Sequence, residues 1–508
     1  MGLLLSIFIG FLASLIGGLY LLGVFRRRQP GEPPLDKGLI PWLGHVLEFR
    51  RNTLKFIERM KQKHGDVFTV QLGGSYITFL QDPLSFGPLV KESKEKLDFV
   101  EYAGDLVHRL FGYKGEEDDH HNLVVYSNKH LKGDGLKVLT QAMMTNLQNL
   151  MLHRIDGAAD NSTWTEDELF MYSYNIMFRA GYLSLFGNTT PESEGSEERS
   201  KEKDRAESEA LFSEFLKYDK FVPNMAYRAL TPSQTLEVKR LLEVFWNALS
   251  MQKMRLKDNI SRWIWDMWQI RNERGMKESM TDRLMFVLLF ASQGNTGPAS
   301  FWLLFFLMKH PEAMAAVKEE VDRVVKESGQ EVRRGGPLVD LTHEMLMKTP
   351  ILDSALEESL RLTSGNLLNR AVLQDMTLKL ADGREYFVRK GDMVVMFPYS
   401  AVQLHPEIHP DPCSFKYDRF LNPDGSKKTD FYMQGKKVKY YNMPWGAGSS
   451  MCPGRFFAAN EMKQLIFLML LYFEFELKNE STEVNFKRWG FGVLQPDRDV
   501  PFRYRLRD

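Results

Sequence analysis

The residue with the clearest chemical potential is Cys452, within the glycine-punctuated stretch PWGAGSSMCPGRFF, residues 444–457. A thiolate is a strong, soft ligand for iron. Small residues beside the sulfur would let a flat macrocycle approach it, and Gly446, Gly448 and Gly454 provide them. A helix that begins directly after the cysteine would also direct its positive end toward the sulfur. These features are compatible with haem ligation, but a cysteine in a glycine-rich loop is more often structural, so this stretch alone does not decide between the two.

A second candidate site lies in FASQGNTGPASFW, residues 290–302, where a polar stretch interrupts an otherwise apolar helix. Pro298 has no N–H, so the carbonyl of Gly294 loses its helical hydrogen-bond donor. The helix is therefore expected to open locally, with the hydroxyl of Thr296 and the amide of Asn295 facing the gap. Such a polar notch could hold dioxygen and deliver protons to it. A packing kink without chemistry is the alternative.

The spacing around the cysteine carries a resemblance to a known family. Trp445-x-x-Gly448-x-x-x-Cys452-x-Gly454 resembles the F-x-x-G-x-x-x-C-x-G signature of the haem-thiolate cytochromes P-450. Trp445 replaces the usual phenylalanine, and Ser450 stands where many members carry an arginine that binds a haem propionate. The resemblance implies haem as the cofactor, with Cys452 and the two glycines at its binding loop and the Cys452 thiolate on the iron.

Other motifs of that family follow in the expected order. Glu358-x-x-Arg361 matches its E-x-x-R motif, and Arg419 in FKYDRF matches its later arginine. The resemblance implies that these three side chains form a charged cluster that locks the cysteine loop. Arg370 falls where members direct an arginine at a propionate. Weaker candidates for the other propionate are Lys129 and Lys132.

The interrupted helix also matches the family, whose pattern there is A/G-G-x-D/E-T. Thr296 is present, but Asn295 replaces the acid. An amide can orient water but cannot titrate, so the route of the protons is open. The resemblance gives Thr296 and Asn295 catalytic roles in placing protons and water. It places Phe290, one turn earlier, in the wall above the haem, where it would contact the substrate.

Several further segments are similar to one branch of the family, which holds sterol 7α- and 12α-hydroxylases and prostacyclin synthase. Among them are DPLSF, SQGNTGP and KYDRFLNPDGSKK. The resemblance implies a mainly α fold with a smaller β region. It implies a monooxygenase that uses dioxygen and NADPH-derived electrons to hydroxylate a sterol, with C12 of 7α-hydroxycholest-4-en-3-one as the first expectation. Sterol 7α-hydroxylation, a prostacyclin-synthase-like isomerisation and a non-catalytic haem sensor are the alternatives.

The expected partners follow from the same resemblance and from charge. The electron donor would be NADPH–cytochrome P-450 reductase of the endoplasmic reticulum. A basic rim on the sulfur side could steer an acidic partner; it would consist of Lys427, Lys428, Lys436, Lys437 and Lys439. The formal net charge of zero argues against nucleic acid as the main partner.

The elements that must position these residues begin with a membrane segment. Residues 2–25 carry no charge and are followed directly by three arginines at 26–28. A helix of this length is about 36 Å long, enough for a hydrocarbon core of about 30 Å. Residues 1–28 are therefore predicted to be a single uncleaved anchor in the endoplasmic reticulum membrane, with the catalytic part in the cytosol. A cleaved signal peptide is the alternative. Only two cysteines in 508 residues exclude a disulfide framework and suit a reducing compartment.

The rest of the chain divides into a proline-rich lead-in, residues 29–44, and a haem-thiolate catalytic domain, residues 45–508. Periodicity predicts a helix ended by Gly65, a hairpin at Gly73-Gly74, and mainly helical structure from about residue 140. Helices are also expected over 282–309 with an interruption, over 351–362, and after Cys452. The polar, charged segment 190–208 is expected to be a mobile surface loop.

His405 and His409 have metal-like i,i+4 spacing. However, Pro406 and Pro410 break a helix there, and no third ligand is close in the sequence. A surface turn is therefore expected in place of a metal site.

Overall fold

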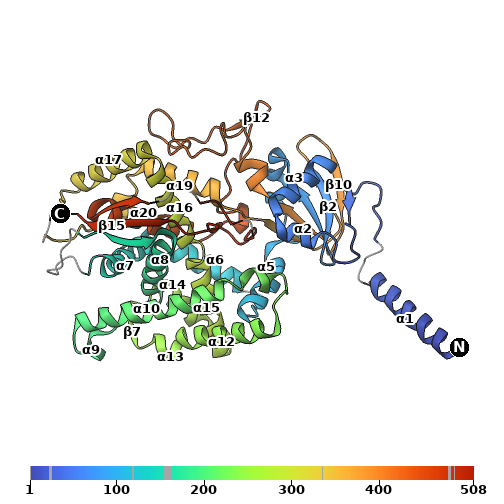
Figure 1. Cartoon of the computed structure of the whole chain (residues 1–508), viewed down its shortest axis with the longest axis horizontal. Helices are drawn as coiled ribbons and strands as arrows, with labels where there is room; N and C mark the ends of the chain where they lie inside the picture. The colour runs from blue at the N-terminus through green and yellow to red at the C-terminus, as the bar shows by residue number, and fades with distance from the viewer. Residues whose placement is uncertain are drawn as a thin grey trace.

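The computed structural model describes residues 2–21, 26–116, 119–153, 163–333, 336–478, 482–485 and 487–507. Figure 1 shows a mainly helical body at one side, a smaller β region at the other, and helix α1 projecting away from the β region. Most of the buried apolar side chains form one core among the helices, and two smaller clusters lie at the sheet. The expectation of a mainly α fold with a smaller β region is confirmed.

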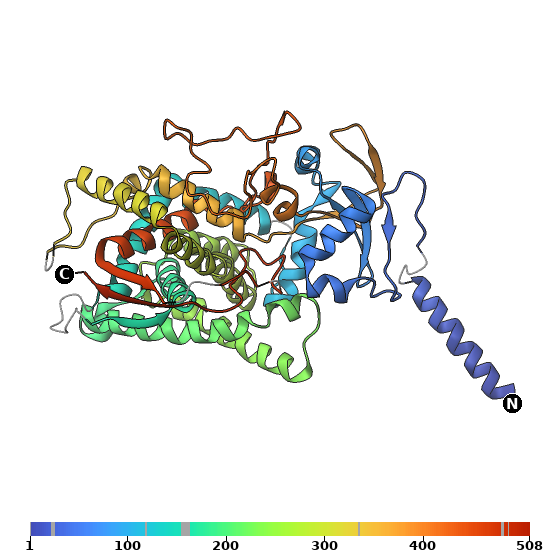
Figure 2. The same cartoon turned by 45° about the horizontal axis from the view of Figure 1, so that its top comes forward.

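Helix α1 (Gly2–Leu21) consists of 20 residues without a charge. Apolar side chains along it, such as Phe8 and Phe11, are more than half exposed, and Figure 2 shows the helix standing clear of the body. Across the described ranges, no helix meets the length and hydropathy of a segment that crosses a bilayer. Residues 22–25 of the predicted anchor lie outside the described residues.

The chain directly after α1 is tied to the sheet by charge. Arg26 donates from both terminal nitrogens to the carboxylate of Asp392, which is 5% exposed, and its guanidinium lies 4.4 Å from the ring centre of Tyr76. Arg389 donates from Nε and Nη2 to the two carboxylate oxygens of the buried Glu32. The first part of the proline-rich lead-in therefore has a fixed position on the β region.

The larger sheet has six strands in the order β1-β2-β3-β11-β8-β4. The predicted hairpin is confirmed: β2 and β3 pair antiparallel through Gly73 and Gly74, both with positive φ. Strand β11 runs parallel to β3 and antiparallel to β8, which places Arg370 opposite Val394. The strands are β1 (Leu35–Asp36), β2 (Val67–Leu72), β3 (Ser75–Leu80), β4 (Leu97–Asp98), β8 (Leu368–Val372) and β11 (Met393–Met396).

The smaller sheets have two or three strands. They are β9 (Met376–Lys379) with β10 (Glu385–Val388), β12 (Tyr432–Met433) with β13 (Lys436–Lys437), β6 (Asn188–Thr189) with β7 (Lys257–Asp258), and β14 (Phe473–Leu477) with β15 (Pro501–Leu506) and β5 (Thr165–Glu168).

The helices before the interrupted segment cover the N-terminal half of the chain. They are α2 (Val46–Arg51), α3 (Thr53–His64), α4 (Phe86–Lys91), α5 (Phe99–Phe111), α6 (Asp119–His130), α7 (Gly133–Met151), α8 (Leu169–Phe186), α9 (Pro191–Glu194), α10 (Glu197–Asp219), α11 (Val222–Ala226), α12 (Pro232–Ala248), α13 (Met251–Met254) and α14 (Arg262–Glu273). Gly65 follows α3 with φ 87°, as the predicted end of that helix requires.

The later helices carry the candidate site. They are α15 (Glu278–Gln293), α16 (Thr296–Lys309), α17 (Pro311–Glu327), α18 (His343–Leu346), α19 (Pro350–Thr363) and α20 (Arg455–Tyr472). Short turns of helix complete the set at Pro83–Ser85, Tyr399–Gln403 and Gly448–Ser450. The predicted interruption near residue 294, the helix over 351–362 and the helix after Cys452 are all confirmed.

Helix α10 corrects the prediction of a mobile loop at residues 190–208. Ser196 caps the helix by accepting from the N–H of Arg199, and Lys201 pairs with Glu197 one turn away. Asp204 is 2% exposed and accepts from the N–H and hydroxyl of Thr189. The polar sequence therefore folds as a helix because some of its polar groups bind other segments, which composition alone does not reveal.

Helices α16 and α20 lie in the middle of the helical body and pack against each other. Almost every side chain of α16 from Thr296 to Leu307 is buried, as is α20 from Asn460 onward. Helix α16 also packs along α8 and α19. The helix break and the loop before α20 are thus attached to the most buried elements of the molecule.

Candidate functional site

The loop before α20 holds Cys452 in a defined turn. The N–H of Cys452 donates to the carbonyl of Trp445 at 2.8 Å. Gly446 and Gly448 both have positive φ, at 76° and 63°. A Cβ on Gly448 would also lie 2.7 Å from Cγ1 of Val90 on α4. Glycine at 448 is therefore required by the conformation of the loop and by its packing against the protein.

Gly454 has a different role from Gly448. Its φ is −86°, and it is the N-cap of α20. The nearest atom to a Cβ there, outside the adjacent chain, would be Cδ1 of Leu131, at 3.9 Å. The protein atoms thus leave open space at Gly454, next to the cysteine, which a bound cofactor would fill.

The surroundings of the sulfur suit a thiolate bound to a cation. Burial raises the pKa of the Cys452 thiol, whereas hydrogen bonds from the N–H groups of Gly454 and Arg455 and the charge of Arg455 lower it. These N–H groups belong to the start of α20, where the helix dipole favours negative charge. A buried thiolate needs a positive partner, and the donors already present would stabilise it once a metal supplies that charge.

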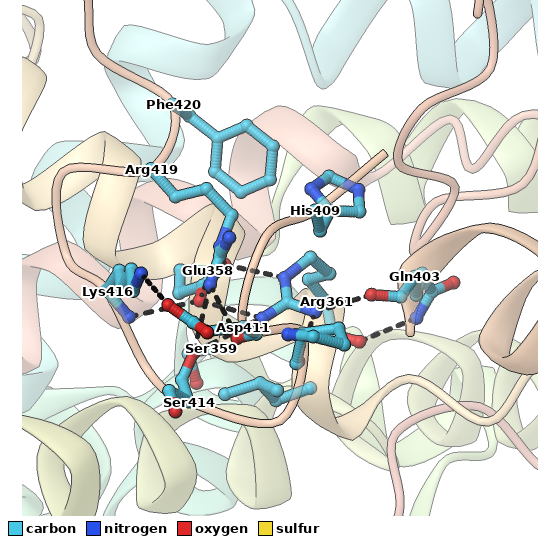
Figure 3. A network of polar contacts seen from close by, with 12 residues as sticks. Glu358, Ser359, Arg361, Gln403, His409, Asp411, Ser414, Lys416, Arg419 and Phe420 are labelled. Atoms are coloured by element: carbon cyan, nitrogen blue, oxygen red, sulfur yellow. Dashed lines mark hydrogen bonds and ion pairs between the residues drawn. The ribbon is translucent and has the colours of Figure 1, made fainter. Parts of the chain in front are cut away.

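The structure brings Glu358, Arg361 and Arg419 together (Figure 3). Arg361 donates to both oxygens of Glu358 at 2.7 and 2.8 Å, and Nε of Arg419 lies 2.9 Å from each of them. Glu358 and Arg361 are fully buried, and Arg419 is 8% exposed. One carboxylate therefore holds two guanidinium groups in the dry interior.

The remaining donors of the two arginines bind backbone carbonyls. Arg361 donates to the carbonyls of Gln403 and Pro412, and Arg419 donates to those of Pro410 and Ser414. Charged donors bind carbonyls more strongly than neutral ones do. The cluster thereby fixes an irregular segment that has little secondary structure of its own.

One hydrogen bond connects this segment to the chain that leads into the cysteine loop, and a second reaches that chain from Asn366, which follows α19. His409 is fully buried, and its Nε2 lies 2.7 Å from the carbonyl oxygen of Tyr441. The side-chain amide of Asn366 donates to the carbonyl of Pro444 at 2.6 Å. The prediction that residues 405–409 form a surface turn is therefore wrong for His409, which serves as a buried internal donor.

The candidate propionate ligands differ in their surroundings. Arg370 is 7% exposed, its Nη1 donates to the carbonyl of Asn369, and its guanidinium lies 5.6 Å from the ring centre of Phe99. Burial lowers the pKa of Arg370, which the charge of Asp98 opposes. Among the described residues no carboxylate forms an ion pair with Arg370, so this buried cation fits an added anionic group.

The two lysines are not equivalent. Lys129 pairs with Asp266 at 2.8 Å, an aspartate that also accepts from His130. Lys132 precedes α7 and follows Leu131, the residue nearest to Gly454. The structure therefore commits Lys129 to α14 and leaves Lys132 as the better candidate.

The helix is interrupted between Gln293 and Thr296, as predicted. The carbonyl of Gly294 accepts from the hydroxyl of Tyr174 on α8 at 3.3 Å. Thr296 is 4% exposed, and its hydroxyl donates to the carbonyl of Ser292 at 2.8 Å. A Cβ on Gly297 would lie 2.0 Å from the ring of Tyr174. The break is thus closely packed on its α8 side.

Asn295 lies at the start of α16, but its side chain does not cap that helix. Its Oδ1 accepts from the N–H of Val493 at 2.9 Å. The amide is therefore directed to the carboxy-terminal segment of the chain, a contact that the sequence did not predict.

Phe290 lies in an aromatic group one turn before the break. Its ring centre is 5.2 Å from that of Phe111, 5.6 Å from Phe215 and 6.1 Å from Tyr218. These rings come from α5, α10 and α15. Together they form an apolar wall next to the polar break.

The comparisons with known proteins agree with this geometry. Residues 33–502 match the cytochrome P-450 family model. The chain belongs to the cytochrome P-450 family. Its cofactor is therefore haem with a cysteine thiolate ligand, and Cys452 is the cysteine whose surroundings fit that ligand. The chain is an oxidoreductase of the monooxygenase class.

Two relatives and one solved structure indicate the branch and the fold of this cytochrome P-450. The 5-beta-cholestane-3-alpha,7-alpha-diol 12-alpha-hydroxylase of Sus scrofa is 49% identical, over 98% of this chain and 97% of its own. Prostacyclin synthase of Homo sapiens is 41% identical, over 94% of this chain and 95% of its own. The retinoic-acid-bound cyanobacterial CYP120A1 shares the fold with a TM-score of 0.69 at 20% identity, covering 94% of this chain and 100% of that structure.

Proposed function

We propose that this cytochrome P-450 hydroxylates a 7α-hydroxylated sterol at C12, on the α face, with 7α-hydroxycholest-4-en-3-one as substrate. The main support is similarity over nearly the full length to sterol 12α-hydroxylases, including the 7-alpha-hydroxycholest-4-en-3-one 12-alpha-hydroxylase of Homo sapiens at 48% identity. The apolar wall around Phe290 suits a large apolar ligand.

The residues of the chain would divide the work as follows. Cys452 would hold the iron through its sulfur, stabilised by the N–H groups of Gly454 and Arg455. Arg370, with Lys132 as its weaker companion, would hold the propionates. When bound, the haem supplies the activation of dioxygen. The hydroxyl of Thr296, at the helix break, would hold and pass a proton, and the rings around Phe290 would exclude water.

An isomerase is the second candidate, because prostacyclin synthase is 41% identical to the chain. Such a reaction rearranges a peroxide and needs neither a reductase nor dioxygen. The buried hydroxyl of Thr296 supports oxygenation instead, since proton delivery has no part in a rearrangement. Sterol 7α-hydroxylation is the nearer alternative, and a haem sensor without turnover is the alternative from another class.

The proposed location is the endoplasmic reticulum membrane. Residues 1–28 would anchor a catalytic domain, residues 45–508, that faces the cytosol, with residues 29–44 as the connection. Support comes from the uncharged residues 2–25 and from the exposed apolar side chains of α1. Arg26 binds Asp392, so the end of the anchor would lie against the catalytic domain.

The proposed electron donor is NADPH–cytochrome P-450 reductase, which would bind the protein surface next to the loop that carries Cys452. That surface has a hollow of about 480 Å³ beside the cysteine loop, lined in part by Trp445, Met451, Arg455 and Phe456. Lys427 pairs with Glu357 and Lys437 with Asp430, so the basic rim has less net charge than the count of lysines indicates.

Product analysis tests the proposed function. The full chain is incubated with the reductase, NADPH and 7α-hydroxycholest-4-en-3-one, and the hydroxylated carbon is assigned by mass spectrometry and NMR. The 12α-hydroxy product should require both NADPH and reductase. A different hydroxylated carbon would reject the regiochemistry. Turnover of a peroxide without NADPH would favour the isomerase, and no turnover with either would favour the sensor.

A further inference from the structure

We propose that Asn295 is a positioning residue, whose side-chain oxygen holds the carboxy-terminal loop, residues 488–495, against the helix break. The loop in turn sets which carbon of the substrate faces the reacting centre. This inference rests on the proposed sterol hydroxylation. It replaces the expectation that Asn295 handles protons or water.

The contact between Asn295 and the loop is close and specific. Asparagine is a preferred N-cap residue, yet this one does not cap α16 and instead accepts from the N–H of Val493 at 2.9 Å. The preceding residue, Gly492, has φ +95°, and a Cβ on it would lie 2.1 Å from Oδ1 of Asn295. Only glycine allows both this backbone conformation and this approach. The two positions therefore fit each other across 198 residues of sequence.

Further hydrogen bonds hold the same part of the loop. Nε1 of Trp302 on α16 donates to the carbonyl of Leu494 at 2.6 Å, and the N–H of Leu494 donates to the carbonyl of Thr363 at 2.8 Å. The N–H of Gly365 donates to the carbonyl of Gly492 at 3.0 Å. With these neighbours fixed, the Asn295 contact decides how the Gly492–Val493 peptide lies relative to the helix break.

Residues of the carboxy-terminal loop also contact the ends of α10 and α11. Arg488 and Gln495 each donate to the carboxylate of Asp219 at 2.8 Å, and Asp219 ends α10. The ring centre of Phe491 lies 6.3 Å from that of Tyr227, which follows α11. The loop therefore joins the helix break to the ends of α10 and α11. A shift of the loop would be passed through Asp219 to α10, the helix that carries Phe215 and Tyr218 of the apolar wall around Phe290.

Substitutions at Asn295 separate positioning from proton handling. Asn295→Asp keeps an oxygen that accepts from Val493, whereas Asn295→Ala removes the acceptor. We expect Asn295→Ala to shift product from C12 to other carbons and to lower the share of NADPH electrons found in product. Asn295→Asp should restore the product ratio. A wild-type product ratio in Asn295→Ala, with coupling altered only in Asn295→Asp, would overturn the proposal in favour of proton handling.

Hydrogen exchange of the holoenzyme tests the contact without any substrate. The amide of Val493 should exchange about fivefold faster in Asn295→Ala, the change expected for the loss of one neutral hydrogen bond. It should stay near the wild-type rate in Asn295→Asp and in the control Ser213→Ala on the exposed side of α10. An unchanged rate in Asn295→Ala would reject the positioning role. If exchange changes but no sterol product forms in the wild type, the proposed function fails while the contact stands.

Gly492→Ala gives an independent view from the loop side. The added Cβ would displace the amide of Asn295, so the same faster exchange at Val493 and the same shift in product ratio are expected. The carbon-monoxide difference spectrum reports whether this variant still holds haem. A variant with full haem and a wild-type product ratio would contradict the proposal.

Discussion

The chain interrupts its regular structure at two places next to the candidate site, and the two interruptions are stabilised in opposite ways. Near the cysteine loop, the buried carboxylate of Glu358 binds the guanidinium groups of Arg361 and Arg419, whose other donors bind backbone carbonyls. At the helix break, the hydroxyl of Tyr174 donates to the freed carbonyl of Gly294, and the N–H of Val493 donates to the side chain of Asn295, so both contacts are single neutral hydrogen bonds. The first arrangement uses charge, and the second uses neutral polar groups from distant segments.

This difference implies different tolerance to change. Removing one member of a buried ion cluster leaves an uncompensated charge in the interior, which typically costs about 3–5 kcal/mol. Removing one neutral hydrogen bond costs about 1 kcal/mol. The cysteine loop is thus expected to be rigid and intolerant of substitution, whereas the break can vary and adjust activity.

The largest effect is expected for Cys452→Ser, which tests whether the rigid region is the one that binds the cofactor. A serine hydroxyl is a much poorer ligand for haem iron than a thiolate. The reduced, carbon-monoxide-treated variant should lose the red-shifted Soret band that thiolate ligation gives, and hydroxylation should be abolished. Cys413→Ser is the matched control, because this other cysteine is exposed. Retention of the red-shifted band in Cys452→Ser would remove this residue from the iron.

The second effect concerns adjacent glutamates with different burial. Glu358→Gln removes the charge shared by Arg361 and Arg419, and it should lower the free energy of unfolding by about 3–5 kcal/mol. Urea denaturation and haem content measure the loss. Glu357→Gln is the control, because Glu357 pairs with the largely exposed Lys427 and should change stability by less than about 1 kcal/mol. Equal losses in the two variants would contradict the contrast between buried and exposed charge.

The third effect is a dependence of the free energy of unfolding on pH, which arises at His409 beside the charged cluster. Burial and the nearby Arg361 lower the pKa of His409 from 6.5 to about 3. The unfolded chain therefore takes up a proton below about pH 6.5 while the folded chain does not. The contribution of His409 to the free energy of unfolding should therefore be complete above about pH 6.5. It should fall by about 1.4 kcal/mol per pH unit as the pH decreases toward 3.

His409→Gln keeps a donor for the carbonyl of Tyr441 but cannot titrate. Urea denaturation at several pH values should therefore show that the free energy of unfolding falls less steeply with decreasing pH in this variant. The difference in slope should correspond to the uptake of about one proton fewer on unfolding. Parallel pH curves for wild type and variant would mean that His409 is already protonated in the folded chain.

The sequence could predict the charged region better than the helix break. Glu358 and Arg361 are fixed by their spacing on one helix, and Arg419 follows from a short motif, so all three could be named in advance. At the break, Pro298 predicted a free carbonyl at Gly294. Its donor, Tyr174, lies 120 residues away and carries no motif. Partners supplied by tertiary packing leave no local signal.

The same limit explains the two errors of prediction. The segment around α10 looked disordered because its charges seemed to need solvent, yet Asp204 binds Thr189 in the interior. His409 looked exposed because prolines flank it, yet the ion cluster and the carbonyl of Tyr441 surround it. In both cases a polar residue is buried because a distant segment supplies its partner.

The smallest effect is expected at the helix break. Tyr174→Phe removes the donor to the carbonyl of Gly294 but keeps the ring that packs against Gly297. Its cost should be about 1 kcal/mol, measured by urea denaturation.

Gly297→Ala places a Cβ 2.0 Å from that ring and should cost more, about 1–3 kcal/mol, because the packing must shift. Combining Gly297→Ala with Tyr174→Leu should recover part of that loss, since the ring is then gone. If Tyr174→Phe instead destabilised the chain as much as Glu358→Gln, the break would be as rigid as the charged region, and the contrast between the two would not hold.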